Sequence, residues 1–229
     1  MIQAIYDEMW VSFCSALKHN QYLLDPFIGC ADDTRRGITA LAYLESNNKL
    51  VSREIALFLR QIQLIEPQQY YHPIDELHLT VLSIITCIAG FELADINPIK
   101  YADVFYKSFK GIDPIEIRFQ GVTASPSCIV IQGFPVGNGL DQLRQNLRKQ
   151  FEISGLCSSI DSRYRLKTAH ITAIRFCSPI KDASKLESVC KKYKNHLFGK
   201  VKFTEFDLVF NNWYQNLSVT KVLGHCSIP

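Results

Sequence analysis

The sequence has little glycine and proline, no large excess of charge of either sign and no long apolar run. Its 229 residues include 11 Gly and 9 Pro spread along the chain, which excludes collagen-like and low-complexity proteins. The formal net charge is +3 and 47% of the residues are hydrophobic, a balance that excludes a disordered chain. We expect one large globular domain or two small lobes that share a core.

Membrane and export signals are also missing. The longest apolar stretch, 77–89, is shorter than a membrane span and is interrupted by His78, Thr80 and further hydroxyl residues. The first residues, MIQAIYDEMWVSF, are acidic where a secretory signal is basic. We therefore expect a cytoplasmic protein without membrane contact, and nothing in the sequence indicates a protein partner.

The eight cysteines form no CxxC pair, and no His-x3-His accompanies them. A zinc ribbon and a thioredoxin-type site are therefore unsupported. Cys87, Cys128 and Cys177 lie in apolar, strand-like runs, where free buried thiols are common. These patterns predict a reducing compartment, no metal site and no cofactor.

The basic residues do not gather into a surface typical of strong nucleic-acid binders. The clusters at 144–149, 163–167 and 191–194 are interpreted as solvated surface. His19, His72, His196 and His225 lack partners at metal-ligand spacing, so each is expected at the surface or in packing. A small anionic ligand fits this balance better than a long duplex.

Hydrophobic periodicity predicts helices that alternate with strands. A leading helix, with Ile2, Ile5, Met9 and Phe13 on one face, is followed by a loop that contains Asp25-Pro26. The further predicted helices cover 52–66 (with Ser52 as N-cap), 98–110, 139–154 and 183–196, and the predicted strands cover 36–44, 77–86, 115–122, 128–134, 166–177, 201–210 and 217–227.

The order strand–helix–strand–helix–strand therefore occurs twice, although the two copies share little sequence. Such a duplication predicts an α+β fold of two pseudo-symmetric lobes, each an antiparallel-rich sheet with helices on its outer face, facing across a central cleft. The predicted division is a helix and loop over 1–33 and a bilobal domain over 34–229. Within that domain, lobe one covers about 34–122 and lobe two about 123–229, with 121–127 as the crossover.

The middle strand of each copy contains His-x-Thr: His78-Leu79-Thr80 in the first and His170-Ile171-Thr172 in the second. Residues two apart on a strand point to the same face, so each motif presents an imidazole beside a hydroxyl. One such motif alone is common and is consistent with a core histidine beside a strand-forming threonine. Two motifs at equivalent places in a repeat favour a shared site.

This arrangement suits a phosphate. In displacement at phosphorus the attacking and leaving oxygens are roughly in line, so a base is wanted on one side and an acid on the other. Two histidines with ordinary pKa values near 6.5 would supply one neutral and one protonated ring near neutral pH. The threonine hydroxyls can donate hydrogen bonds to the non-bridging oxygens.

From about residue 35 to the end, the chain resembles the 2H phosphoesterases, which include the 2′-5′ RNA ligase-like proteins and the cyclic phosphodiesterases. The stretches that carry the resemblance are Leu77-His78-Leu79-Thr80-Val81-Leu82 and His170-Ile171-Thr172-Ala173-Ile174-Arg175. The resemblance implies that His78 and His170 are the acid and base, and that Thr80 and Thr172 hold the phosphate. Ala169 stands where many members have proline.

The resemblance also implies a substrate-binding role for Arg175, five residues after the second histidine. Strict alternation from His170 would point Arg175 to the opposite face, so this role requires a bulge or the end of the strand. A plain surface arginine is the other interpretation. Aromatic residues that could stack on a base are Tyr71, Phe134, Trp213 and Tyr214.

The leading hypothesis is a metal-independent phosphodiesterase that acts on 2′,3′-cyclic phosphates or 2′-5′-linked nucleotides, free or at RNA ends. The alternative is a binding module that holds RNA ends or a nucleotide in the same cleft without turnover. A metal-dependent hydrolase is a third possibility, disfavoured by the lack of nearby acidic ligands.

Overall fold

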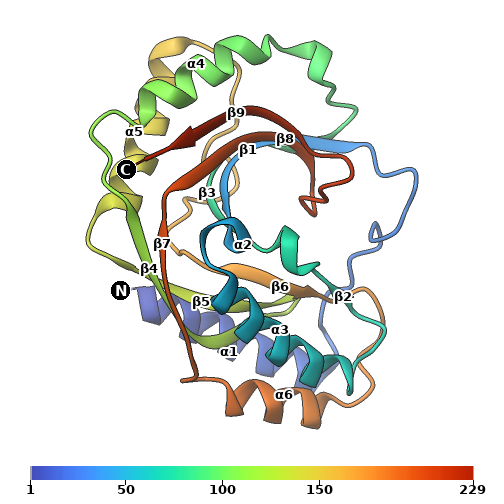
Figure 1. Ribbon diagram of the computed structural model, residues 1–229. Coiled ribbons are helices and arrows are strands. Elements are labelled where there is room, and N and C mark those ends of the chain that lie inside the picture. The colour runs from blue at the N-terminus through green and yellow to red at the C-terminus, as the bar shows by residue number, and fades with distance from the viewer. Residues whose placement is uncertain (1, 229) are drawn as a thin grey trace.

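The computed structural model describes residues 2–228; Met1 and Pro229, the ends of the predicted division, lie outside the described residues. Two antiparallel sheets form the centre, with helices on their outer sides (Figure 1). The predicted α+β fold with two facing lobes is confirmed. None of the helices within residues 2–228 has both the length and the apolar character needed to span a membrane.

The first sheet has the strand order β3-β1-β8-β9. Its strands are β1 (Arg35–Tyr43), β3 (His78–Ala89), β8 (Glu205–Asn212) and β9 (Lys221–Ser227). Helices α4 (Pro98–Ser108) and α5 (Gly139–Ser154) pack against each other, α4 also against β9 and α5 against β3. This layer forms the upper part of Figure 1.

The second sheet has the strand order β2-β6-β5-β4-β7. Its strands are β2 (Tyr70–Tyr71), β6 (Ile171–Arg175), β5 (Cys128–Val136), β4 (Ile115–Ser125) and β7 (Leu197–Phe203). Helices α1 (Ile2–His19), α3 (Lys49–Gln63) and α6 (Ala183–Lys192) lie on its outer side, at the bottom of Figure 1. Short helical segments are α2 (Leu44–Asn47), η1 (Ile74–Glu76) and η2 (Leu93–Asp95).

The two sheets exchange strands between the halves of the chain. β8 and β9, from the end of the chain, pair with β1 in the first sheet, and β4, from the first half, pairs with β5 and β7 in the second. The first sheet therefore contains strands from both predicted lobes, and so does the second. The division of the chain into domains at 33 and lobes at 122 stays a prediction. β4 continues to Ser125, so the predicted crossover at 121–127 is wrong.

Three predicted elements differ in detail. The predicted strand over 201–210 is two strands, β7 and β8, which belong to different sheets. The predicted strand over 166–177 is regular only over β6. Helix α3 begins before Ser52 because Asn48 is its N-cap: the Asn48 side chain accepts hydrogen bonds from the backbone N–H groups of Leu50 and Val51. All eight cysteines are free.

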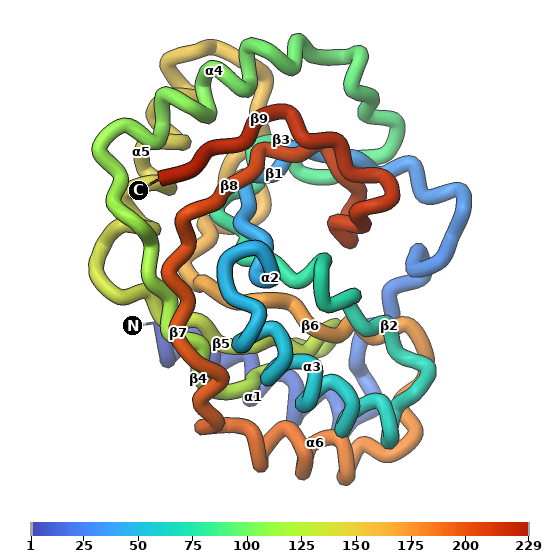
Figure 2. The backbone as a smooth tube through the Cα atoms, in the orientation of Figure 1, coloured from blue at the N-terminus to red at the C-terminus, as the bar shows by residue number. Residues whose placement is uncertain are grey.

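Helix α1 braces the five-stranded sheet. Tyr6, fully buried, donates its hydroxyl hydrogen bond to the Gly133 carbonyl at 3.0 Å and accepts one from the Gly133 N–H at 3.1 Å. Thr123 Oγ1 of β4 donates to the Tyr6 carbonyl at 2.9 Å. From the end of α1 the chain then runs to β1 through the segment 20–34, drawn in blue in Figure 2.

Gly133 also lets the chain approach closely just before the second motif. A Cβ atom at this position would overlap the Ala169 carbonyl oxygen, and Ala169 precedes His170. We expect Gly133→Ala to lower the free energy of unfolding by about 1–3 kcal/mol, because backbone must shift to relieve the overlap. Denaturant unfolding followed by circular dichroism measures this.

Gly139→Ala is the matched control. A Cβ atom at Gly139 meets its nearest neighbour at 3.5 Å, an ordinary contact. Equal unfolding free energies for the two variants would contradict the close approach at Gly133.

Candidate active site

The two His-x-Thr motifs line one cleft between the sheets. His78 and Thr80 come from the start of β3, Thr172 comes from β6, and His170 stands immediately before β6. Leu79 and Val81, the alternating residues of β3, are buried in the core. The facing sheets thus bring together two motifs that are far apart in the sequence. The other polar residues of the cleft include Thr39, His72, Ser83, Thr86, Ser159, Ser162, Arg163, Arg175 and Gln215.

The His78 ring is held by the backbone. Its Nδ1 lies 2.7 Å from the carbonyl oxygen of Glu76. A carbonyl can only accept, so Nδ1 carries the proton in the neutral ring and Nε2 carries the lone pair. Neutral His78 therefore offers a hydrogen-bond acceptor at Nε2.

His170 is held by a side chain instead. Its Nδ1 lies 2.7 Å from Thr168 Oγ1, a hydroxyl that can either donate or accept. Thr168 is itself buried. The ring is therefore fixed in orientation, while its tautomer is set by the direction of this one hydrogen bond.

Burial keeps both motif histidines neutral near pH 7. Burial is the largest cause that lowers the pKa of His78 to about 4, and the charge of Arg175 lowers it further. Burial likewise lowers the pKa of His170 to about 4, with Arg144 as the main charge that adds to the effect. The expectation of ordinary pKa values is therefore wrong, and a bound anion would favour protonation of these rings.

Arg144 of α5 connects the two motifs from behind. The residue is 1% exposed. Its Nε donates to the Val81 carbonyl at 2.8 Å, and its Nη2 donates to the carbonyls of Thr80 at 3.2 Å and Thr168 at 2.7 Å. Its assignment to a solvated surface cluster is therefore wrong. One guanidinium holds the backbone beside both histidines.

Arg175 reaches the cleft through a bulge in β6. Ile129 of β5 pairs with Ile174, but the next residue, Val130, pairs with Thr172, so Ala173 is the extra residue. A bulge shifts the alternation of side chains by one. Arg175 consequently lines the same cleft as His170 and Thr172.

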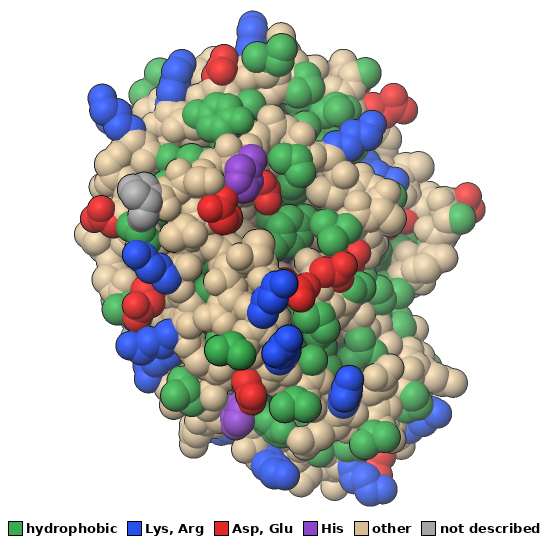
Figure 3. All heavy atoms as spheres, in the orientation of Figure 1, with side chains coloured by type: hydrophobic (Ala, Val, Ile, Leu, Met, Phe, Trp, Pro, Cys, Tyr) green, Lys and Arg blue, Asp and Glu red, His purple; other side chains and the backbone are tan. Residues whose placement is uncertain are grey.

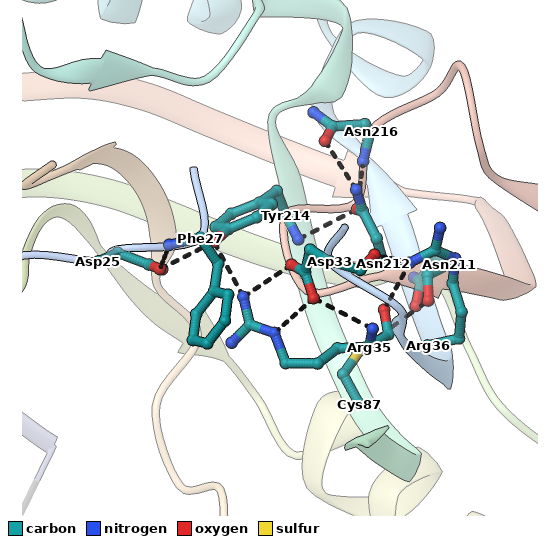
Figure 4. A network of polar contacts seen from close by, with 10 residues as sticks. All are labelled: Asp25, Phe27, Asp33, Arg35, Arg36, Cys87, Asn211, Asn212, Tyr214 and Asn216. Carbon is teal, nitrogen blue, oxygen red and sulfur yellow. Dashed lines mark hydrogen bonds and ion pairs between the residues drawn. The ribbon is translucent and has the colours of Figure 1, made fainter. Parts of the chain in front are cut away.

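Trp213 and Tyr214 form one wall of the cleft, in the turn between β8 and β9. Arg163 and Arg175 lie over the Trp213 ring at 4.8 and 5.7 Å from its centroid. Tyr214 donates to Asp25 Oδ1 and accepts from Arg35 Nη2, both at 2.9 Å (Figure 4). Aromatic and cationic groups therefore converge beside the motifs, as base and phosphate recognition would need.

Two of the four expected stacking residues lie elsewhere. The Tyr71 hydroxyl donates to the Glu66 carbonyl at 2.8 Å, and the ring packs against the core. Phe134 packs edge-on against Tyr6 under α1, with Arg118 over its ring at 5.4 Å. Neither residue lines the cleft, so we assign no stacking role to Tyr71 or Phe134.

Several cleft residues were not found from the sequence. His72 is 3% exposed and lines the cleft, so it is not a surface residue. Neighbouring side chains of a strand point to opposite faces, so a core position for Tyr71 could have indicated that His72 faces the cleft. Thr39 and Gln215 belong to segments far apart in the chain and meet at 3.5 Å. No local pattern marks them.

Glu76 links the His78 strand to the aromatic wall. Its carbonyl holds the His78 ring, as described, while its buried carboxylate accepts from Leu217 N at 2.8 Å and from Asn216 Nδ2 at 3.0 Å. Asn216 Nδ2 also donates to the Tyr70 hydroxyl at 2.8 Å. The turn that carries Trp213 and Tyr214 is thereby fixed to the residue that orients His78.

Charges on the outer surface are mixed. On the face shown in Figure 3, Lys and Arg side chains alternate with Asp and Glu side chains. Within residues 2–228, no three His, Cys, Asp or Glu side chains are grouped as ligands for a metal ion.

Comparison with known proteins identifies the fold. No family model matches the sequence, and no curated protein matches it. Solved structures do match. The TT0787 protein of Thermus thermophilus has a TM-score of 0.56 at 17% identity, covering 85% of this chain and 97% of its own. Escherichia coli LigT in its 3′-AMP complex has a TM-score of 0.56 at 16% identity, covering 85% and 98%.

The chain shares the LigT fold. A third structure, described as a phosphoesterase, has a TM-score of 0.54 at 16% identity and covers 85% of this chain and 98% of its own. The LigT-like fold therefore accounts for 85% of this chain and for nearly the full length of the matched proteins.

Removing the Glu76 carboxylate should loosen the turn that carries Trp213 and Tyr214 but leave the orientation of the His78 ring unchanged. In Glu76→Ala the turn that carries Trp213 and Tyr214 loses two hydrogen bonds to a buried carboxylate, so any affinity of the cleft for a nucleotide probe should fall about tenfold or more. The His78 contact uses the backbone carbonyl and remains. Calorimetric titration with adenosine 2′-phosphate measures the effect. Asp75→Ala, at an exposed neighbour in η1, is the control; equal affinities would contradict the link.

Anion binding should take up protons. Both rings have pKa values of about 4, and a bound anion raises them. Affinity for sulfate, whose charge is constant over this range, should rise as the pH falls from about 7 to about 5, by up to about tenfold per pH unit for each proton bound. Titration calorimetry in buffers of different ionisation enthalpy counts the protons.

His170→Ala should take up fewer protons with sulfate than the unmodified protein. His225→Ala is the control, because His225 is exposed and bonded to Asp207 and Glu205 outside the cleft. Affinity for sulfate that does not change with pH would contradict the neutral state of the rings.

Proposed function

We propose that this chain is a 2H phosphoesterase: a metal-independent phosphodiesterase for 2′,3′-cyclic phosphates or 2′-5′-linked nucleotides, free or at RNA ends. The observation that carries the proposal is that both His-x-Thr motifs line one cleft. The LigT-like fold supports it, since one neighbour with that fold is described as a phosphoesterase. LigT itself is described in complexes with 3′-AMP, ATP and NADP+.

The orientation of the rings supports an assignment of roles. His78 Nε2, which carries the lone pair, takes the proton from a water molecule as the water oxygen attacks phosphorus. The bond from phosphorus to the 2′ or 3′ ribose oxygen breaks in line, and His170 donates a proton to that oxygen. The hydroxyls of Thr80 and Thr172 and the charge of Arg175 stabilise the non-bridging oxygens.

The substrate itself completes the protonation state. His170 must be protonated to act as the acid, and its pKa of about 4 keeps it neutral near pH 7. A phosphodiester carries a negative charge, and its binding beside His170 raises the pKa of that ring, while His78 stays neutral to act as the base. His170 therefore takes up a proton from water when the substrate binds, and it donates this proton in the reaction.

The same neutral rings favour the second candidate, a module that binds nucleotides or RNA ends without turnover. If the bound phosphate does not raise the pKa of His170 enough, no acid is available and the ligand stays intact. Affinity for a 2′,3′-cyclic nucleotide without product after long incubation would support this candidate.

Replacing either histidine should nearly abolish activity. We expect His78→Ala and His170→Ala to lower kcat/KM for a 2′,3′-cyclic nucleotide by about 10²–10⁴-fold, the usual contribution of a general acid or base. Product formation is followed by chromatography, in EDTA as well as without it. His19→Ala, at an exposed residue bonded to the Ser15 carbonyl, is the control.

Activity of either motif variant near that of the control would contradict the acid–base mechanism. Loss of activity in EDTA would contradict its metal independence.

A further inference from the structure

Part of the cleft is polar but has no partner within the protein. Among residues 2–228, eight buried side-chain atoms lack a hydrogen bond. Four of them belong to three residues of the cleft: Nδ1 and Nε2 of His72, Nε of Arg175 and Oε1 of Gln215. Buried polar groups are normally paired, and an unpaired one costs free energy. All four atoms belong to residues that line the same cleft, where they are available to pair with a ligand.

His72 stands beside the first motif. Its backbone N–H donates to the Ala173 carbonyl at 3.1 Å, at the bulge of β6. Its ring lies 6.4 Å from the His78 ring and 5.0 Å from the Tyr70 ring, centroid to centroid. Burial, followed by the charge of Arg175, keeps the pKa of His72 well below its ordinary value. The ring is therefore neutral and presents one donor and one acceptor nitrogen.

Gln215 is brought into the cleft by an unusual backbone. Its φ is 62°, in the left-handed region that non-glycine residues seldom adopt. Its Nε2 donates to Thr39 Oγ1 at 3.5 Å, which leaves Oε1 as an unpaired acceptor. Strained residues of this kind concentrate at functional sites.

The unpaired groups include both donors and acceptors. His72 supplies one of each, Arg175 supplies a donor and Gln215 an acceptor. An ionised phosphate oxygen can only accept, so it would leave the two acceptors unpaired. A hydroxyl group donates one hydrogen bond and can accept two, so it can pair with one of the two acceptors as well as with the donors.

We propose that His72, Arg175 and Gln215 form a hydroxyl-binding subsite that reads the ribose hydroxyl next to the phosphate-bearing carbon. The subsite rests on the proposed function, because it takes the phosphate to lie between His78 and His170. It favours ligands in which that hydroxyl is free, namely 2′-5′-linked nucleotides, which keep a 3′-hydroxyl; adenosine 2′-phosphate is their mononucleotide counterpart.

The test compares two ligands that differ in one hydroxyl. Adenosine 2′-phosphate and 3′-deoxyadenosine 2′-phosphate are titrated by calorimetry into the full chain. We expect the unmodified protein to bind the first about tenfold or more tightly, because the deoxy compound leaves buried donors and acceptors unpaired. His72→Phe keeps an aromatic ring beside Tyr70 and should bind both ligands equally.

Inorganic phosphate is the control ligand for the variants, and its affinity should be the same in His72→Phe as in the unmodified protein. Gln215→Asn is the second variant: asparagine tolerates the left-handed backbone, but its shorter side chain should not reach, so discrimination should fall. Equal binding of the two nucleotides by the unmodified protein, or no binding of either, would overturn the subsite. Full discrimination by His72→Phe would do the same.

Failure of the subsite and of the proposed function can be told apart. Discrimination between the two ligands without turnover of cyclic or 2′-5′-linked substrates would sustain the subsite and overturn the activity. Turnover combined with equal binding would sustain the activity and overturn the subsite.

Discussion

The buried guanidinium of Arg144 is the contact on which the geometry of the cleft depends. It donates to the carbonyls of Thr80 and Val81 in β3 and of Thr168 just before the second motif. An arginine removed from water is stable only when such acceptors surround it. Two of the three carbonyls belong to β3 of the first sheet and the third lies just before β6 of the second, so the hydrogen bonds of Nε and Nη2 fix the two motifs relative to each other.

The same charge also acts on the chemistry. Burial lowers the pKa of Arg144 to about 10, so it remains cationic near neutral pH. Its charge adds to burial in lowering the pKa of His170. The contact that aligns the motifs thus also keeps His170 neutral until an anion enters the cleft.

The walls of the cleft are held by polar contacts between distant segments. Asp25, from the segment after α1, accepts from the Tyr214 hydroxyl, and Arg35 of β1 pairs with Asp33 through two contacts of 2.8 Å (Figure 4). Glu76 binds the same turn from the other side. These contacts join the leading segment, the first motif and the turn between β8 and β9. The segment before β1 therefore helps to hold the aromatic wall of the cleft in place.

The two motifs and most of the order of helices and strands could be predicted from the sequence, which left Arg175 open between an inward position at a bulge and a plain surface position. Those features are local: alternation places His78 beside Thr80, and amphipathic periods define the helices. Tertiary structure alone decided which strands share a sheet, because pairing is a contact between segments far apart in the chain. It also decided that Arg144 is buried, that Tyr71 and Phe134 lie away from the cleft, and that His72 and Gln215 lie in it. The pKa values of the two motif histidines depend on burial and on charges from other elements, and neither quantity can be read from neighbouring residues.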